Sequence, residues 1–234
     1  MAETERVEIY RISDHHREAD SDLVISEDEA LLRLNGENYR SFYCLPTHLE
    51  ELAMGHLISE GICSPSGIGS IEVRQEGNRF IIEAKIDQHS HRGLDKIDSE
   101  VRIGTRDVWD AVERLDRESR LFKETGGAQG AEIFGRSGSV FAEDISRHCA
   151  IDKAIGLALE SGMNLTMSSL VTSCRQTGST IYKAIRSQIP IVITISAPTG
   201  LAIESARRFG ITLIGFAREN RFNIYSHKWR VTGW

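Results

Sequence analysis

The sequence has no Cys-x-x-Cys pair, no long run of Lys and Arg, and no apolar run near the roughly 20 residues that span a bilayer. The net charge of −6 over 234 residues disfavours a general binder of nucleic acid or membrane surfaces. The charged start, MAETERVEIY, lacks the apolar segment of a secretory signal. We therefore expect a cytoplasmic protein that binds neither membranes nor nucleic acid.

The cysteines are few and far apart in the chain, at Cys44, Cys63, Cys149 and Cys174. In a reducing compartment this spacing predicts free thiols rather than a disulfide framework. A content of 40% hydrophobic and 26% charged residues is ordinary for a globular chain. The length suffices for one sizeable domain, or for one core with a smaller lobe.

The first part of the chain alternates short β-type runs with one helical pattern. Three strands are expected at 7–12, 29–34 and 39–44, with a turn at Asn35-Gly36 between the second and third. A helix is expected over 47–61, capped by Thr47 with Glu50 and ended by Gly61. Its apolar face, which should pack on the strands, consists of Leu49, Leu52, Ala53 and Leu57.

A hairpin is predicted over 69–86, around Glu76-Gly77-Asn78, and a polar linker follows over 87–99. The two linker histidines, His89 and His91, lack further metal ligands, which favours a solvated loop.

The second part of the chain has a more regular pattern. A polar amphipathic helix over 106–122 and a hairpin over 131–144 are followed by alternating helices and apolar strands. Those helices are expected at 145–162, 177–188 and 197–210, and those strands at 165–173, 190–196 and 211–217. The near-continuous apolar run PIVITIS is typical of a strand buried on both faces. The series predicts an α/β three-layer core over 100–234, beside a smaller α+β lobe over 1–99.

Ligands of such sheets bind at the carboxyl ends of the parallel strands. This rule selects the segments 172–175, 196–199 and 216–221. They bring Arg175, Arg218, Arg221, hydroxyl groups including that of Thr199, and two helix N-termini towards one edge. Guanidinium groups and helix N-termini both favour phosphate, so we expect a phosphate-bearing ligand such as a nucleotide. The alternative is that these arginines pair with acidic surface residues.

Two further segments carry weaker signals. GGAQG at 126–130 resembles a phosphate loop only loosely, and a β-turn explains it as well. His148, at the start of a helix and one turn before Asp152, is a candidate ligand or acid–base group, or a structural histidine.

Cys174 is predicted at a helix N-terminus beside Arg175, and both features lower the pKa of a thiol. The alternative is that it simply fills space in the core.

Several long motifs occur in the order found in the FdhD family of formate dehydrogenase accessory proteins, which this chain resembles over about residues 40–64 and 122–227. They are PTHLEELAMGHLISEGI, KETGGAQGA, AEDISRHCAIDKAIG, TSCRQTGSTIYKA and SAPTGLAIESARRFGITLIGFARENRFNIYS. The resemblance implies a core like that of cytidine deaminases and a homodimer. It also implies passage of a persulfide from a cysteine desulfurase to a molybdenum bis(molybdopterin guanine dinucleotide) cofactor destined for formate dehydrogenase.

The same resemblance implies a cofactor site with a GDP-like end group. The stretch that lines up with the family's cofactor-binding segment consists of Phe216, Ala217, Arg218, Glu219, Asn220 and Arg221. Further candidates for the site are Arg175, Thr199, Gly126, Gly127, Arg147 and His148.

This chain departs from the family at the cysteine loop. The family carries its persulfide on a Cys-Gly-x-Cys-Gly loop, and the corresponding stretch here, HRGLDKIDSEVRIGTRD, has no cysteine. Gln129, Cys149 and Cys174 replace a histidine, an asparagine and a glycine of the family motifs. We therefore expect an accessory protein that binds the cofactor without the usual sulfur chemistry. The alternatives are an enzyme that uses Cys174 as a surrogate thiol, and a zinc-dependent deaminase-like hydrolase that uses His148, Cys149 and Cys174.

Overall fold

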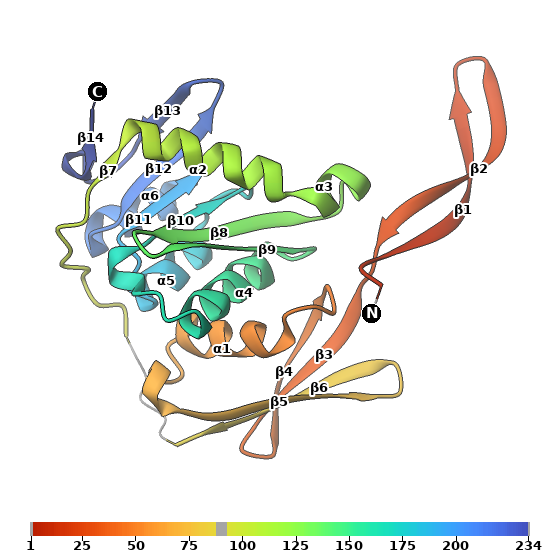
Figure 1. The fold of residues 1–234 in the computed structure, drawn as a ribbon, viewed down its shortest axis with the longest axis horizontal. Coiled ribbons are helices and arrows are strands. Elements are labelled where there is room, and N and C mark those ends of the chain that lie inside the picture. Colours follow the sequence, from red (N-terminus) through yellow and green to blue (C-terminus); the bar gives the residue numbers. More distant parts are fainter. Residues whose placement is uncertain (1, 88–92, 234) are drawn as a thin grey trace.

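The computed structural model describes residues 2–87 and 93–233, so the predicted loop histidines His89 and His91 lie outside the described residues. The chain is a mixed α/β protein with a long N-terminal hairpin, a four-stranded sheet and a six-stranded sheet (Figure 1). The helices of the described residues are α1 (Leu49–Ser59), α2 (Thr105–Glu118), α3 (Arg120–Thr125), α4 (Arg147–Glu160), α5 (Gly178–Arg186) and α6 (Gly200–Phe209). No helix in 2–87 or 93–233 combines the length and the apolar character that a membrane crossing needs.

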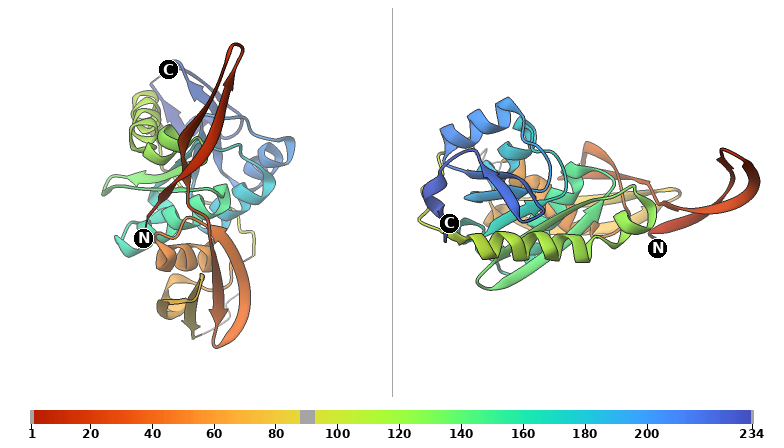
Figure 2. Two further views of the ribbon diagram at one scale, coloured as in Figure 1. Left: turned by 90° about the vertical axis from the view of Figure 1, so that its right-hand side faces the viewer. Right: turned by 90° about the horizontal axis from the view of Figure 1, so that it is seen from above.

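The N-terminal hairpin projects from the body as an arm (Figures 1 and 2). It consists of β1 (Thr4–Ser13) and β2 (His16–Ile25), paired antiparallel along their whole length. The strand predicted at 7–12 lies within β1, whereas β2 was not predicted because its charged sequence HREADSD has no β-type pattern. Pairing with β1 therefore determines the conformation of β2.

The four-stranded sheet has the order β4-β3-β6-β5. Its strands are β3 (Asp28–Leu34), β4 (Glu37–Cys44), β5 (Ile68–Glu76) and β6 (Arg79–Ile86). The predicted turn at Asn35-Gly36 is confirmed, with φ of 49° and 88° that suit a tight hairpin. The predicted hairpin over 69–86 is also confirmed.

Helix α1 lies on this sheet and buries all four predicted apolar residues. Gly61 follows its end with φ 72°, as predicted. The predicted Thr47 cap is wrong: the N-cap is His48, in a left-handed conformation with φ 51° and without a side-chain cap. The Thr47 amide instead donates to the Leu45 carbonyl, 2.8 Å away, so the chain turns before the helix begins.

The six-stranded sheet has the order β13-β12-β11-β10-β8-β9. β10 (Ser169–Thr172), β11 (Ile191–Thr194) and β12 (Thr212–Arg218) run parallel, which confirms the predicted β-α-β-α-β series. β8 (Gln129–Gly135), β9 (Gly138–Asp144) and β13 (Arg221–Ile224) extend the sheet antiparallel. Alternate residues of the central strands pack on α4, α5 and α6 on one face and on α2 on the other. The sheet is thus covered by helices on both faces.

The helix predicted over 106–122 is interrupted at Ser119, between α2 and α3. The carboxylate of Glu143, on β9, accepts the amides of Leu121 and Phe122, each at 2.9 Å. A carboxylate at a helix N-terminus satisfies amides that otherwise have no partner. The break therefore results from a contact with a distant strand, which the local sequence does not encode.

Helices α1 and α4 cross at very close range, joining the N-terminal part to the six-stranded core (Figure 1). Gly55 of α1 faces the backbone of Asp152, and Gly156 of α4 faces the backbone of Glu51. Any Cβ at either glycine would collide with the opposite helix. The predicted boundary between residues 99 and 100 remains a prediction.

Residues 97–104, part of the stretch that lacks the family cysteines, lie along the amino ends of the parallel strands. The Ile97 amide donates to the Phe209 carbonyl at 2.8 Å, and the Ser99 hydroxyl donates to the Thr166 carbonyl at 3.1 Å. The buried Arg230 guanidinium donates to the carbonyls of Ser99 and Gly210. A short parallel pair, β7 (Ile103–Gly104) with β14 (Val231–Thr232), follows. This stretch is thus held at the edge opposite to the predicted ligand edge.

Candidate functional site

The three strand ends selected from the sequence lie side by side. The Gln176 amide donates to the Ala197 carbonyl at 3.1 Å, and the Thr199 amide donates to the Gln176 carbonyl at 2.9 Å. The Phe216 amide donates to the Ser196 carbonyl at 2.9 Å. Backbone hydrogen bonds therefore join the segments 172–176, 196–199 and 216–221 into one edge, beside the starts of α5 and α6. We call this region the strand-end edge.

Two features of segment 216–221 are unusual. Phe216 has φ 53°, at a bulge in the pairing of β12 with β13. A left-handed bulky residue stores roughly 1–3 kcal/mol of strain, which is common at functional sites. Arg218 and Arg221 are direct partners across the turn formed by Glu219 and Asn220. Like charges placed directly opposite repel each other, and a bound anion would offset that repulsion.

The loop before β8 reaches the same edge because β8 runs antiparallel to β10. The Ser173 hydroxyl accepts the Gly130 amide at 2.9 Å, and the Ser173 amide donates to the Gly130 carbonyl at 3.0 Å. Gly126, with φ 70°, ends α3, and both Gly126 and Gly127 are exposed. Gly126 therefore has a structural role as a helix end, and a phosphate-binding role for the loop remains a prediction.

The predicted position of Cys174 at a helix N-terminus is wrong, whereas its reactivity stays a prediction. Cys174 precedes the α5 N-cap, Thr177, by three residues, so it is not at the helix N-terminus. Only 5% of the residue is exposed, and burial raises the pKa of its thiol in spite of the nearby Arg147 charge and the hydrogen bond with Thr172. The geometry thus matches the space-filling alternative.

The zinc alternative gains no support either. Cys149 belongs to the core cluster around α1, and Cys174 belongs to the cluster beneath the six-stranded sheet. Within residues 2–87 and 93–233, no group of three or more His, Cys, Asp and Glu could hold a metal ion.

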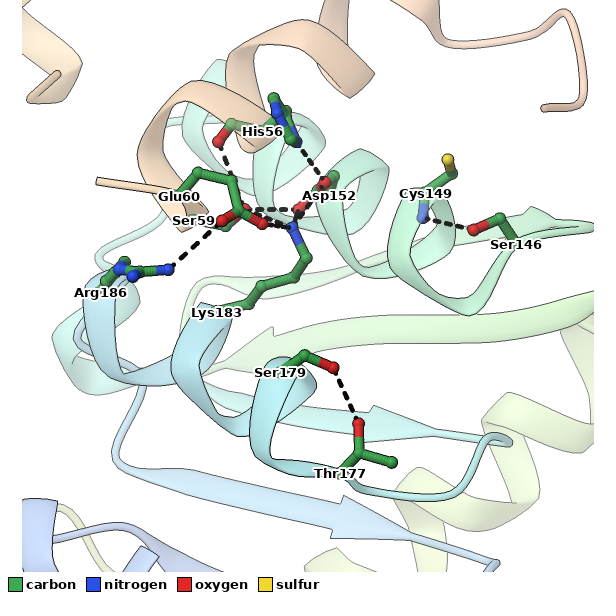
Figure 3. A network of polar contacts seen from close by, with 10 residues as sticks. All are labelled: His56, Ser59, Glu60, Ser146, Cys149, Asp152, Thr177, Ser179, Lys183 and Arg186. Atoms are coloured by element: carbon green, nitrogen blue, oxygen red, sulfur yellow. Dashed lines mark hydrogen bonds and ion pairs between the residues drawn. The ribbon is translucent and has the colours of Figure 1, made fainter. Parts of the chain in front are cut away.

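A buried polar network joins α1, α4 and α5 (Figure 3). The Lys183 Nζ lies 2.9 Å from both carboxylate oxygens of Asp152 and 2.7 Å from Glu60 Oε1. Asp152 Oδ1 accepts the Ser59 hydroxyl at 2.6 Å, and Asp152 Oδ2 lies 3.1 Å from His56 Nδ1. Arg186 Nη1 lies 3.3 Å from Glu60 Oε2. We call these six residues the interhelix network.

Charge pairing within the network outweighs the cost of burial. Burial by itself raises the pKa of Asp152, but the Lys183 charge and the His56 and Ser59 contacts bring it down to about 2. Burial likewise opposes the charge on Lys183, but Asp152 and Glu60 raise its pKa. Both groups are therefore charged at neutral pH.

The network borders a cavity of about 370 Å³ between β4, α1, α4 and α5. Its lining includes His148 and Cys149, from the first turn of α4, together with His56, Asp152 and Lys183. Burial, followed by the charges of Lys183 and Arg147, lowers the pKa of His148, which is therefore neutral. The structure thus places His148 at this cavity, which we call the interhelix cavity.

Comparison with known proteins identifies the chain's relatives. The model of the FdhD/NarQ family matches residues 25–101 and 86–232. Two relatives named "Sulfur carrier protein FdhD" are similar to nearly the whole chain. That from Methanothermobacter thermautotrophicus is 33% identical over 96% of this chain and 97% of its own length. That from Wolinella succinogenes is 32% identical over 97% of this chain and 88% of its own length.

The chain belongs to the FdhD/NarQ family. In the fold, too, this FdhD/NarQ member matches a crystal structure described as a formate dehydrogenase accessory protein from Desulfotalea psychrophila. The TM-score is 0.88, the identity is 23%, and the match covers 99% of this chain and 100% of that chain.

The interhelix network of this FdhD/NarQ protein was missed at the sequence level, although it left a signal. Asp152 lies between Ile151 and Ile155 in the largely buried helix α4, and Lys183 lies between Ile181 and Ala184 on the apolar face of α5. Ionisable residues at such positions are seldom buried without partners. That they are partners of each other depends on helix packing.

Proposed function

We propose that this FdhD/NarQ member is an accessory protein of formate dehydrogenase maturation that binds the molybdenum bis(molybdopterin guanine dinucleotide) cofactor as its cargo. The guanosine diphosphate end would lie at the strand-end edge. The observation that supports this proposal is the set of backbone hydrogen bonds that joins the three strand ends, the segments of Arg175 and of the Arg218–Arg221 pair among them, at one edge of the sheet.

The chemistry of this edge suits a diphosphate. Arg175, Arg218 and Arg221 are exposed, so their guanidinium groups are accessible to an anion. The N-termini of α5 and α6 add partial positive charge, and Thr199 caps α6 through a 3.4 Å contact with the Ala202 amide. Phe216, held in a strained conformation, is half-buried and lies two residues before Arg218 in the chain.

The proposal includes the properties that the family resemblance implies. They are a core layered like a cytidine deaminase, a homodimer, and a cysteine desulfurase and formate dehydrogenase as partners. The relatives' printed name, sulfur carrier protein, supports a place in the same maturation process.

Binding of guanosine diphosphate tests the proposal by titration calorimetry on the whole chain. We expect saturable binding that weakens at least about tenfold in Arg218→Ala and in Arg221→Ala, because a hydrogen bond to a charged group contributes roughly 1.5–3 kcal/mol. Arg117→Ala, which removes an exposed arginine from α2, is the matched control and should bind as the parent does. Absence of binding, or equal weakening in all three variants, would contradict the nucleotide site.

A further inference from the structure

The arm, which is the hairpin of β1 and β2, has no core within its own chain. None of the residues 4–25 is buried, although the two strands pair along ten residues each. Figures 1 and 2 show that the outer part of the arm stands clear of the body. Because an isolated two-stranded hairpin is at best marginally stable in water, an arm of this length needs a surface outside its own chain on which to pack.

One face of the arm is largely apolar. Residues that lie opposite each other in an antiparallel pair share a face. Five apolar side chains share this face, which we call the apolar face of the arm: Tyr10, Ile12, Ala19, Leu23 and Ile25. Arg6, Glu8 and Arg17 lie among them. The aliphatic stem of an arginine can cover apolar surface while its charged end stays in water, so this face remains suited to packing.

The opposite face of the arm is acidic. It carries the half-buried Val7 and Ile9 together with a set of carboxylates: Glu5, Glu18, Asp20 and Asp22. Carboxylates are costly to bury without partners. The acidic face therefore favours water, and the apolar face is the one that can pack on another surface.

The apolar face is already a packing surface at its base. Ile25 packs against the buried cluster of Leu45, Leu121 and Ala128 on the body. Towards the tip, Tyr10 and Ile12 are 82% and 69% exposed, more than any other large hydrophobic residue in the described parts of the chain. A contiguous apolar surface of this kind marks an interaction site.

We propose that the arm is exchanged between two copies of this chain: its apolar face packs on a second copy, which places its own arm on the first in return. This inference rests on the homodimer of the proposed function and names the surface that forms it.

The area of the arm favours a second copy over a different protein. Strands of ten residues form a ribbon about 33 Å long and about 10 Å wide, so one face offers about 330 Å². A single arm on a different protein would bury about 660 Å² when both surfaces are counted, which is the size of a crystal-packing contact. Two exchanged arms bury about 1,300 Å², which lies within the range of stable interfaces.

Reciprocal exchange also closes the assembly at two copies. Each arm is then used and each receiving surface is filled, so no apolar face is left to recruit a third copy. The carboxylates Glu18, Asp20 and Asp22 lie along β2, and charged side chains on an edge strand disfavour the addition of further strands. We therefore expect a dimer rather than a filament.

Sedimentation equilibrium of the whole chain tests the proposal. We expect the parent to be a dimer, and Tyr10→Ser combined with Ile12→Ser to raise the dimer dissociation constant at least about 100-fold, because each dimer loses four packed apolar side chains. Val7→Ser combined with Ile9→Ser is the matched control, since it removes two apolar side chains from the opposite face of the same strand. That control should dimerise as the parent does. Circular dichroism verifies that both variants are folded.

Three outcomes would contradict the exchange. A monomeric parent would overturn both the homodimer and the role of the arm. A dimer that neither pair of substitutions weakens, or that both weaken equally, would overturn the role of the apolar face alone. Guanosine diphosphate binding, measured on the same samples, reports the nucleotide site separately.

Cross-linking identifies the chain that each arm contacts. The four native cysteines are buried, so a cysteine introduced at the tip by Asp14→Cys can be labelled selectively with a photo-cross-linker. In an equal mixture of unlabelled chains and chains labelled with heavy nitrogen, we expect cross-linked peptides that combine the two isotopes. Cross-links confined to peptides of a single isotope would show that the arm packs on its own chain, and would overturn the proposal.

Discussion

Replacing Lys183 by Met is expected to lower the free energy of unfolding by about 3–5 kcal/mol, because the change leaves two carboxylates without their common cation. Asp152 and Glu60 both contact the Lys183 ammonium, and Asp152 is 1% exposed. A methionine fills a similar volume but cannot donate a hydrogen bond. Urea unfolding at neutral pH, followed by circular dichroism, measures the difference.

A surface pair provides the control for Lys183→Met. Lys123 lies 3.0 Å from Asp116, and its side chain is 47% exposed. Lys123→Met should therefore change the free energy of unfolding by less than about 1 kcal/mol. Equal small effects in both variants would mean that the buried network contributes little to stability.

Acid should weaken the same network. The folded-state pKa of Asp152, about 2, is lower than its ordinary value of 3.8, so the carboxylate stabilises the fold above about pH 4. That contribution is lost as the pH falls through 2. In Lys183→Met the cation that keeps this pKa low is gone, so the loss should begin at higher pH. A parallel acid dependence of the two proteins would contradict the assigned pairing.

Gly156→Ala is expected to reduce the free energy of unfolding by about 3 kcal/mol or more, because the new methyl group collides with the Glu51 backbone of α1. Inside a helix the same change would normally stabilise by roughly 0.5–1 kcal/mol, so the sign of the effect identifies the close crossing. Thermal and urea unfolding both measure it.

Gly200→Ala is the control for the helix crossing. Gly200 is the first residue of α6, and a Cβ built there meets nothing within 4 Å. Its stability should match or slightly exceed that of the parent. If Gly156→Ala behaved like Gly200→Ala, α1 would have to separate from α4 without cost, and the interhelix cavity would lose its geometry.

Local patterns predicted most strands and helices because the relevant information lies within a few residues. Asn35-Gly36 adopts the backbone angles of a hairpin turn almost regardless of its surroundings. The apolar run at 190–196 fits only a strand covered on both faces, and β11 has that environment. The strand-end rule then placed segments 172–175, 196–199 and 216–221 together, because parallel strands share one carboxyl edge.

Contacts between distant elements account for the wrong predictions. Glu143 interrupts the predicted helix at Ser119 by capping α3 from another strand. From the sequence, Cys174 was expected at a helix N-terminus, which would lower the pKa of its thiol. In the structure Cys174 lies in the loop before α5, and burial of that loop raises the pKa instead.

The sequence by itself determined the α/β alternation, the membership of the chain in a recognisable family, the strand-end edge, and the absence of a cysteine pair between 91 and 107. Only the tertiary structure decided which buried groups meet. His56, Asp152 and Lys183 belong to three helices, and their partnership depends on the glycine-mediated approach of α1 to α4 and on the packing of α5 beside them. Short-range propensities act over a few residues, whereas the pairing of buried charges depends on where whole helices pack.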